Sequence, residues 1–66
     1  MLNTNALRAE IARNGMTQAS VAKSIGISEV SFSNKMKTGK FGLLEAEAIA
    51  RLLDIRDPGA IFFNLE

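Results

Sequence analysis

The sequence predicts an all-helical fold of five short helices in a single domain covering residues 1–66. The length of 66 residues leaves no room for a second ordinary domain. Leu, Ile, Val, Met and Phe together make up 22 residues, a third of the chain, which is enough for a compact core. Apolar residues recur at helical spacing between Gly, Pro and cap-forming residues, whereas alternating strand patterns are scarce.

The first predicted helix covers residues 5–14. Leu7 and Ile11 stand four residues apart and therefore share one face, and Gly15 ends the run. The candidate cap residues before this helix are Asn3, Thr4 and Asn5.

Two further helices are predicted on either side of a short turn. The first begins at Thr17 and stops at Gly26, a residue that adopts the left-handed conformation without strain. Its shared apolar face consists of Val21, Ala22 and Ile25. The next helix begins at Ser28 and stops at Gly39. Because little more than Gly26 and Ile27 separates the pair, the spacing is that of a helix-turn-helix.

The two faces of the helix after Ser28 differ in character. Phe32 and Met36 lie on one face, which we expect to be buried. The opposite face carries Val30, Ser33, Asn34 and Lys37. In a helix-turn-helix, the exposed face of the second helix can enter the major groove of DNA.

Two helices are expected after the loop at residues 40–42. The first ends near Leu53, and its apolar stripe is predicted at Leu44, Ala48, Ile49, Leu52 and Leu53. The last is short, with Asp57 as its N-cap and Pro58 as its first residue.

Charge is unevenly distributed, although the net charge is only +1. Residues 17–41 carry four lysines against one glutamate, a net charge of +3. Residues 42–66 carry two arginines against five acidic residues, a net charge of −3. A basic region of this kind is a candidate footprint for a polyanion.

Several function classes are excluded or disfavoured. The chain has no Cys, His, Trp or Tyr, so it offers no thiolate, no imidazole and no ordinary zinc ligand set. Glu45 and Glu47 project about 200° apart on a helix and cannot share a site. We therefore expect no catalytic activity, no metal and no cofactor. The apolar runs are too short to span a membrane, so a soluble cytoplasmic protein is expected.

Residues 16–39 and 49–55 carry a family resemblance. The pattern TQ..LA...G.S...IS is met by Thr17, Gln18, Val21, Ala22, Gly26, Ser28, Phe32 and Ser33, and IARLLDI at 49–55 is similar to IAKALGI. The chain thus resembles the lambda-repressor-like (Cro/CI-type, XRE) helix-turn-helix family, and most of all its small Cro-type phage repressors. The resemblance implies a compact five-helix DNA-binding domain that is commonly a dimer on a partly palindromic operator. The chain departs from the family at Ile11 and Met36, where many relatives pair an arginine with an acidic residue.

The resemblance and the outward helix face together give the candidate DNA-binding residues. Gln18, by resemblance, would meet a phosphate at the start of its helix. On the groove face, Asn34 can pair with adenine, Val30 can meet a thymine methyl group and Glu29 can accept from cytosine. The full set comprises Gln18, Ser28, Glu29, Val30, Ser33, Asn34, Lys35, Lys37 and Lys40, of which the three lysines are candidate phosphate contacts.

The apolar C-terminal segment leaves two alternatives open. A short last helix has difficulty burying all of its large side chains within so small a domain. These side chains are Ile61, Phe62, Phe63 and Leu65. Either they fold back onto the first and fourth helices, or some of them form a homodimer contact, which can be weak and assembled on DNA.

The function predicted from these observations is that of a DNA-binding transcriptional regulator, a Cro-like repressor, which reads double-stranded DNA with the helix after Ser28. Its partners would be a partly palindromic operator and a second copy of the chain, with no membrane. The alternative is a protein-interaction module of the same fold, such as an antitoxin or an anti-repressor, in which Val30 and its neighbours would face protein.

Overall fold

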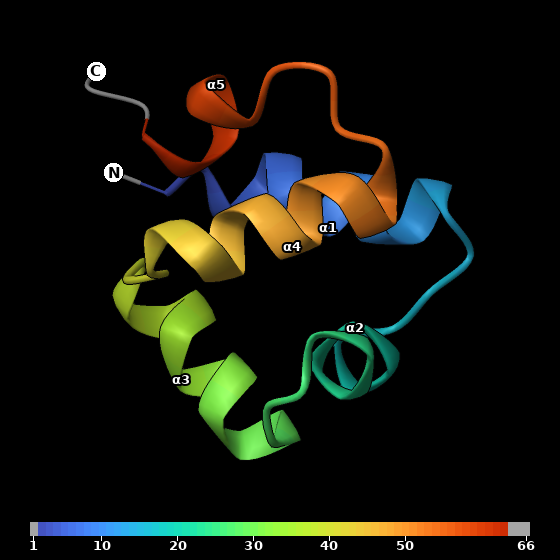
Figure 1. The fold of residues 1–66 in the computed structure, drawn as a ribbon, viewed down its shortest axis with the longest axis vertical. Helices are drawn as coiled ribbons and strands as arrows, with labels where there is room; N and C mark the ends of the chain where they lie inside the picture. The colour runs from blue at the N-terminus through green and yellow to red at the C-terminus, as the bar shows by residue number, and fades with distance from the viewer. Residues whose placement is uncertain (1, 64–66) are drawn as a thin grey trace.

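The computed structural model describes residues 2–63, and all regular secondary structure in that range is helical. The helices are α1 (Thr4–Arg13), α2 (Gln18–Ile25), α3 (Glu29–Thr38), α4 (Leu43–Leu53) and α5 (Pro58–Phe62). The predicted all-helical class with five helices is therefore confirmed for this part of the chain (Figure 1).

Side-chain caps fix where most of the helices begin. Thr17 caps α2 by accepting a hydrogen bond from the third backbone N–H of the helix, and Ser28 and Asp57 do the same for α3 and α5. These three starts agree with the sequence prediction. Helix α1 begins at Thr4, one residue earlier than predicted, because Asn3 is the residue whose side chain caps it.

Two glycines end helices in the left-handed region. Gly26 has a φ of 84° after α2, and Gly39 has a φ of 71° after α3. At Gly39 a Cβ would also stand 3.4 Å from the Cβ of Leu2. The glycine therefore serves both the turn and the close approach of the N-terminal segment.

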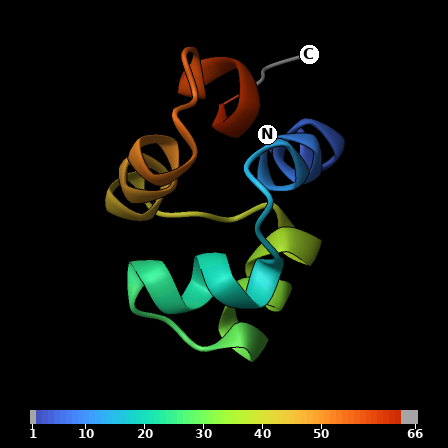
Figure 2. The same cartoon turned by 90° about the vertical axis from the view of Figure 1, so that its right-hand side faces the viewer.

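Helices α1, α4 and α5 pack together above the pair α2 and α3 in the view of Figure 2. The N-terminal segment is tied to α5 by the hydrogen bond from Asn3 N to Ile61 O, at 2.7 Å. The C-terminal end of α4 is capped from α1, since Arg13 Nη2 and Asn14 Nδ2 donate to Leu53 O at 2.8 and 3.0 Å. The Cα radius of gyration is 10.5 Å, against about 10.8 Å for a compact domain of this length.

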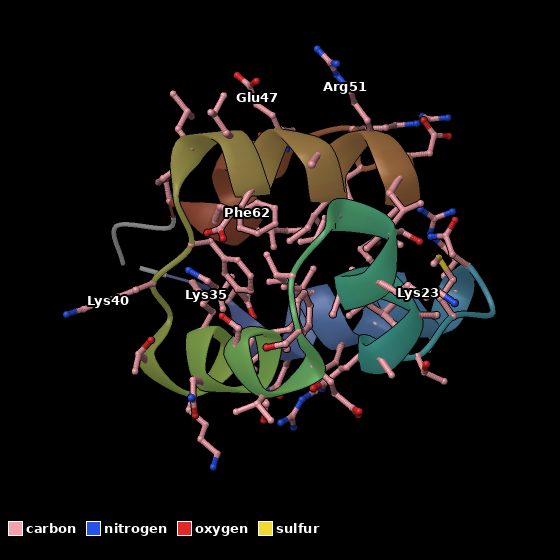
Figure 3. The ribbon with its side chains drawn as sticks, turned by 60° about the horizontal axis from the view of Figure 1, so that its bottom comes forward. Lys23, Lys35, Lys40, Glu47, Arg51 and Phe62 are labelled. Carbon is pink, nitrogen blue, oxygen red and sulfur yellow. The ribbon has the colours of Figure 1, made fainter. Side chains whose placement is uncertain are left out.

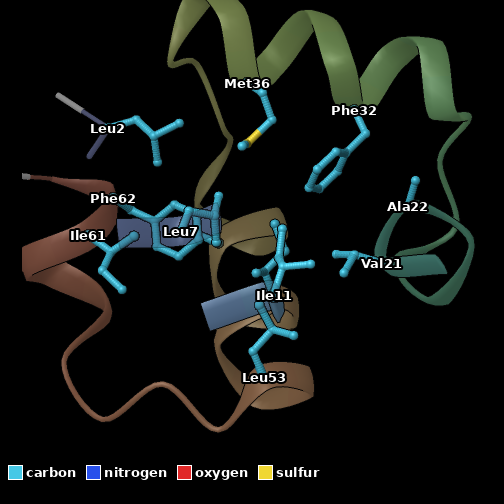
Figure 4. Close-up of a cluster of buried hydrophobic side chains, with 12 residues drawn as sticks. Leu2, Leu7, Ile11, Val21, Ala22, Phe32, Met36, Leu53, Ile61 and Phe62 are labelled. Carbon is cyan, nitrogen blue, oxygen red and sulfur yellow. The ribbon is translucent and has the colours of Figure 1, made fainter. Parts of the chain in front are cut away.

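All of the helices contribute to one apolar core (Figure 4). Its buried members are Leu2, Leu7, Ile11, Val21, Ala22, Phe32, Met36, Ala46, Ile49, Leu53, Ile61 and Phe62. A chain of aromatic contacts crosses it, because the Phe41 ring meets the ring of Phe32 at 5.5 Å and that of Phe62 at 5.7 Å, both edge to face. The core residues of α3 are therefore linked through the loop before α4 to α5.

The buried face of α4 differs from the predicted stripe. Leu44 is 80% exposed and Ala48 is also exposed, so their assignment to the stripe was wrong. Ala46 takes a buried place beside Ile49 and Leu53. The cause is that apolar residues surround much of this helix, so their spacing leaves the rotation of the stripe undetermined and the packing against α2 and α5 decides it.

Candidate nucleic-acid interface

Helix α3 presents one face to the core and the other to solvent. Phe32 and Met36 are buried, as predicted, while Val30 on the opposite face is 72% exposed. Local sequence explains this orientation, because the two large apolar side chains lie one helical turn apart and draw that side of the helix inward. The polar residues of α3 are consequently displayed on the outside.

The outward face of α3 forms a shallow depression of roughly 330 Å³. Its lining is Glu29, Val30, Ser33, Asn34 and Lys37, the five residues predicted as the groove-reading face. Asn34 is exposed, and its side-chain amide makes no hydrogen bond to another residue in 2–63. The face thus offers an amide, a hydroxyl, a branched methyl pair and a cation within two turns of one helix, which is the set of groups that reads base edges.

Ser28 and Glu29, the N-cap and first residue of α3, stabilise the start of the helix and are also exposed. Ser28 is exposed, and its Oγ accepts a hydrogen bond from Ser31 N at 3.1 Å, so the oxygen is committed to the cap while the hydroxyl hydrogen can still be donated. Glu29 occupies the first turn, where its negative charge is favourable to the helix dipole. Both remain at the surface next to Val30.

Lys35 differs from Lys37 and Lys40 in forming an ion pair within the domain. Its Nζ lies 3.1 Å from Oε1 of Glu45, and the same oxygen accepts a hydrogen bond from Gly42 N at 2.9 Å. The Gly42 N–H and, secondly, the Lys35 ammonium hold the pKa of Glu45 below its usual value. The side chain of Lys35 is therefore occupied in joining α3 to the start of α4, a contact that sequence spacing did not indicate.

Lys37 and Lys40 are exposed, and no ion pair involves either of them within residues 2–63. Figure 3 shows the Lys40 side chain extending away from the body of the molecule, while Lys35 turns back toward the chain that enters α4. Lys23 is a further exposed cation on α2. Two of the three lysines predicted as phosphate contacts are thus displayed without a partner in the described chain, and the third is paired.

Gln18 lies at the first position of α2, as predicted, and is half-buried. It borders a second shallow hollow, of roughly 220 Å³, together with Arg8 of α1. Arg8 is exposed, so the hollow beside the first residue of α2 is bordered by a cation. Sequence reasoning missed Arg8, because only the folded chain shows that Arg8 and Gln18 border the same hollow.

The C-terminal segment divides between the two alternatives. Ile61 and Phe62 are buried in the core, so these two side chains fold back onto the domain. Phe63 is 49% exposed and remains a candidate dimer contact, while Leu65 lies outside the described residues. The dimer contact through this segment stays a prediction that now depends on Phe63.

No family model, no curated protein and no solved structure matches the chain. Among residues 2–63, no helix combines the length and apolar character needed to cross a membrane. In the same range, no three acidic side chains are gathered where they could hold a metal ion.

Proposed function

We propose that the chain is a sequence-specific, double-stranded DNA-binding transcriptional regulator, a Cro-like repressor that inserts α3 into the major groove. The observation that carries the proposal is the outward face of α3, where the 72% exposed Val30 stands beside Ser33, Asn34 and Lys37. An exposed branched apolar side chain among polar groups that can read base edges is suited to a contact with a thymine methyl group. The resemblance of residues 16–39 to the lambda-repressor-like helix-turn-helix supports the same conclusion.

Base reading in this proposal is divided among four side chains. Asn34 forms a two-bond pair with adenine, Val30 packs on a thymine methyl group, and Lys37 reaches guanine or a neighbouring phosphate. Glu29 accepts from cytosine and at the same time disfavours positions where it would meet a phosphate. Ser28 and Ser33 supply hydroxyl groups at the edge of this contact.

Phosphate contacts would hold the helix in register. Lys37 lies in the last turn of α3, and Lys40 follows the Gly39 that ends this helix. Gln18 lies at the start of α2, where free backbone N–H groups favour an anion. Lys35 contributes to the local positive potential but is paired with Glu45. With about two phosphates neutralised by lysine per copy, log K should fall with log salt at a slope of roughly −1.8 for each half-site.

The partners that fit this function are a partly palindromic operator and a second copy of the chain. A twofold dimer would place two α3 helices about 34 Å apart, in successive major grooves on one side of the duplex. Phe63 belongs to the contact predicted for the C-terminal segment, and a weak contact would assemble mainly on DNA. A regulator of this kind acts in the cytoplasm, on the nucleoid.

A protein-interaction module, such as an antitoxin or anti-repressor, is the second candidate. The same exposed Val30 favours it, because a branched apolar side chain is also suited to a protein contact. The two candidates differ in their dependence on salt. Binding through several phosphates weakens steeply as salt rises, whereas an apolar contact with a protein does not.

Selection of bound duplexes from a random pool, followed by titration of the selected duplex at several salt concentrations, tests the proposal. We expect one sequence with approximate twofold symmetry to be enriched, and the affinity for it to fall linearly on the logarithmic salt scale. Enrichment of no sequence, together with no binding at low salt, would contradict DNA binding and favour the interaction module.

A further inference from the structure

We propose that a second copy of the chain binds the groove between α4 and α5, with the two α4 helices antiparallel about a twofold axis. In this arrangement Glu47 of each copy pairs with Arg51 of the partner subunit. The inference rests on the self-association proposed above, since Phe63 lines this groove, and it deepens that proposal by naming the surface and the ion pairs of the contact. The groove lies apart from the outward face of α3, and the contact requires no DNA.

Exposed apolar residues mark the groove. Four large apolar side chains are exposed in residues 2–63, and apart from Val30 they belong to the N-terminal end of α4 or the end of α5. Leu43 is 63% exposed and Phe63 is 49% exposed, and both line a groove of roughly 440 Å³ whose floor includes Ala46, Ala50 and Pro58. An apolar concavity of this kind on a small domain is a surface that gains from being covered.

Two opposite charges lie along the rim of the groove. Glu47 and Arg51 both line it, one helical turn apart on the exposed side of α4. Neither forms an ion pair with another residue in 2–63. Figure 3 shows both side chains extending outward from α4, on the side of the molecule away from α3. A partner bound there leaves the outward face of α3 uncovered.

This charge pattern is complementary to itself. In an antiparallel pair whose twofold axis crosses α4 at the level of residue 49, residues 47 and 51 lie about 3 Å to either side of the axis along each helix. Residue 47 of one copy therefore faces residue 51 of the other, and the contact is made twice because a twofold interface uses the same surface on both subunits. An axis beside residue 47 would bring the two glutamates together instead, so charge selects the first register. Self-complementarity identifies a second copy as the occupant.

Charge reversal gives a direct test, performed without DNA by sedimentation equilibrium up to about 1 mM protein, which detects contacts with a millimolar Kd. The wild type should self-associate. Glu47→Arg and Arg51→Glu should each weaken self-association at least about tenfold, because each variant places like charges opposite one another. An equimolar mixture of the two variants should associate again as a heterodimer, because the arginine introduced into one variant then faces the glutamate introduced into the other.

The matched control is Lys23→Glu, which makes the same charge change as Arg51→Glu on α2, outside the groove, and should leave association unchanged. Circular dichroism of each variant verifies that the helices are retained. A wild type that stays monomeric to about 1 mM, variants that associate like the wild type, or a mixture that stays monomeric would each overturn the proposal. Because DNA is absent from every arm, loss of the DNA-binding proposal would leave these results unaffected.

Discussion

Replacement of Phe32 by alanine tests the assignment of the two faces of α3. The Phe32 side chain is 0% exposed, and its ring packs edge to face against Phe41, which in turn contacts Phe62. Truncation removes a fully buried ring at the point where α3 meets the loop before α4. Removal of a buried phenylalanine costs about 3 to 5 kcal/mol in the free energy of unfolding.

That cost is large compared with the whole stability of the domain. At about 0.05 to 0.15 kcal/mol per residue, a chain of 66 residues has a free energy of unfolding of roughly 3 to 10 kcal/mol. Domains of this size lose about 4 to 8 °C of Tm per kcal/mol. We therefore expect Phe32→Ala to lower the Tm by roughly 12 to 40 °C, and to unfold the protein outright if the wild type lies at the lower end of the stability range.

Thermal and urea unfolding followed by circular dichroism provide the measurement. Phe32→Leu is the matched control, since it keeps most of the apolar volume and should cost much less than the alanine variant. Val30→Ala, on the outward face, should change the Tm by only a few degrees at most. A folded Phe32→Ala protein whose Tm is close to that of the wild type would refute the inward orientation of this face, and with it the assignment of Asn34 and Val30 to the outside.

Three other changes test the candidate interface and its support. Asn34→Ala should weaken binding to the selected duplex by about 1 to 3 kcal/mol and relax the preference at one base pair per half-site. Asn5→Ala, an exposed control in α1, should leave both unchanged. An equal loss of affinity on all duplexes would identify Asn34 as a contact to the DNA backbone instead. Lys40→Ala should reduce the magnitude of the salt slope by about 1 per half-site. Lys35→Ala should produce a smaller change, because Lys35 is in an ion pair with Glu45. Equal changes in the two variants would contradict the distinction between the two lysines. Glu45 has a lowered pKa in the folded state, so its stabilising contribution is present above its ordinary value of 4.5 and is lost as the pH falls through the folded pKa. Glu45→Gln should reduce this loss of Tm on acidification, and an unchanged pH profile would contradict the pairing.

Local signals account for the parts of the fold that sequence reasoning predicted. The starts of α2, α3 and α5 follow from Thr17, Ser28 and Asp57, whose side chains cap the helix that each precedes. Gly26 and Gly39 end their helices in the left-handed region for an equally local reason. Each of these features depends on residues within one turn of each other, so the sequence alone contains the information.

Features that depend on the packing of distant helices were not predictable in the same way. The face of α4 was misassigned at Leu44 and Ala48 because the apolar residues of that helix allow more than one rotation. That Arg8 and Gln18 border one hollow depends on how the folded chain places α1 relative to the start of α2. For the C-terminal segment, the sequence left burial and self-association open, and packing placed Ile61 and Phe62 in the core.

Lys35 illustrates why the number of clustered lysines in a sequence does not predict how many of them are free to contact phosphate. It lies two residues before Lys37, and in sequence the two are equivalent cations near the end of one helix. In the folded chain, the Glu45 oxygen that accepts from the Gly42 backbone also lies 3.1 Å from the Lys35 ammonium. A phosphate that approached Lys35 would have to compete with a carboxylate already held in place, so part of the Coulomb attraction would be offset by the loss of that ion pair. Lys37 and Lys40 face no such competition within the described chain, and the electrostatic part of the proposed DNA binding should therefore depend mainly on these two lysines.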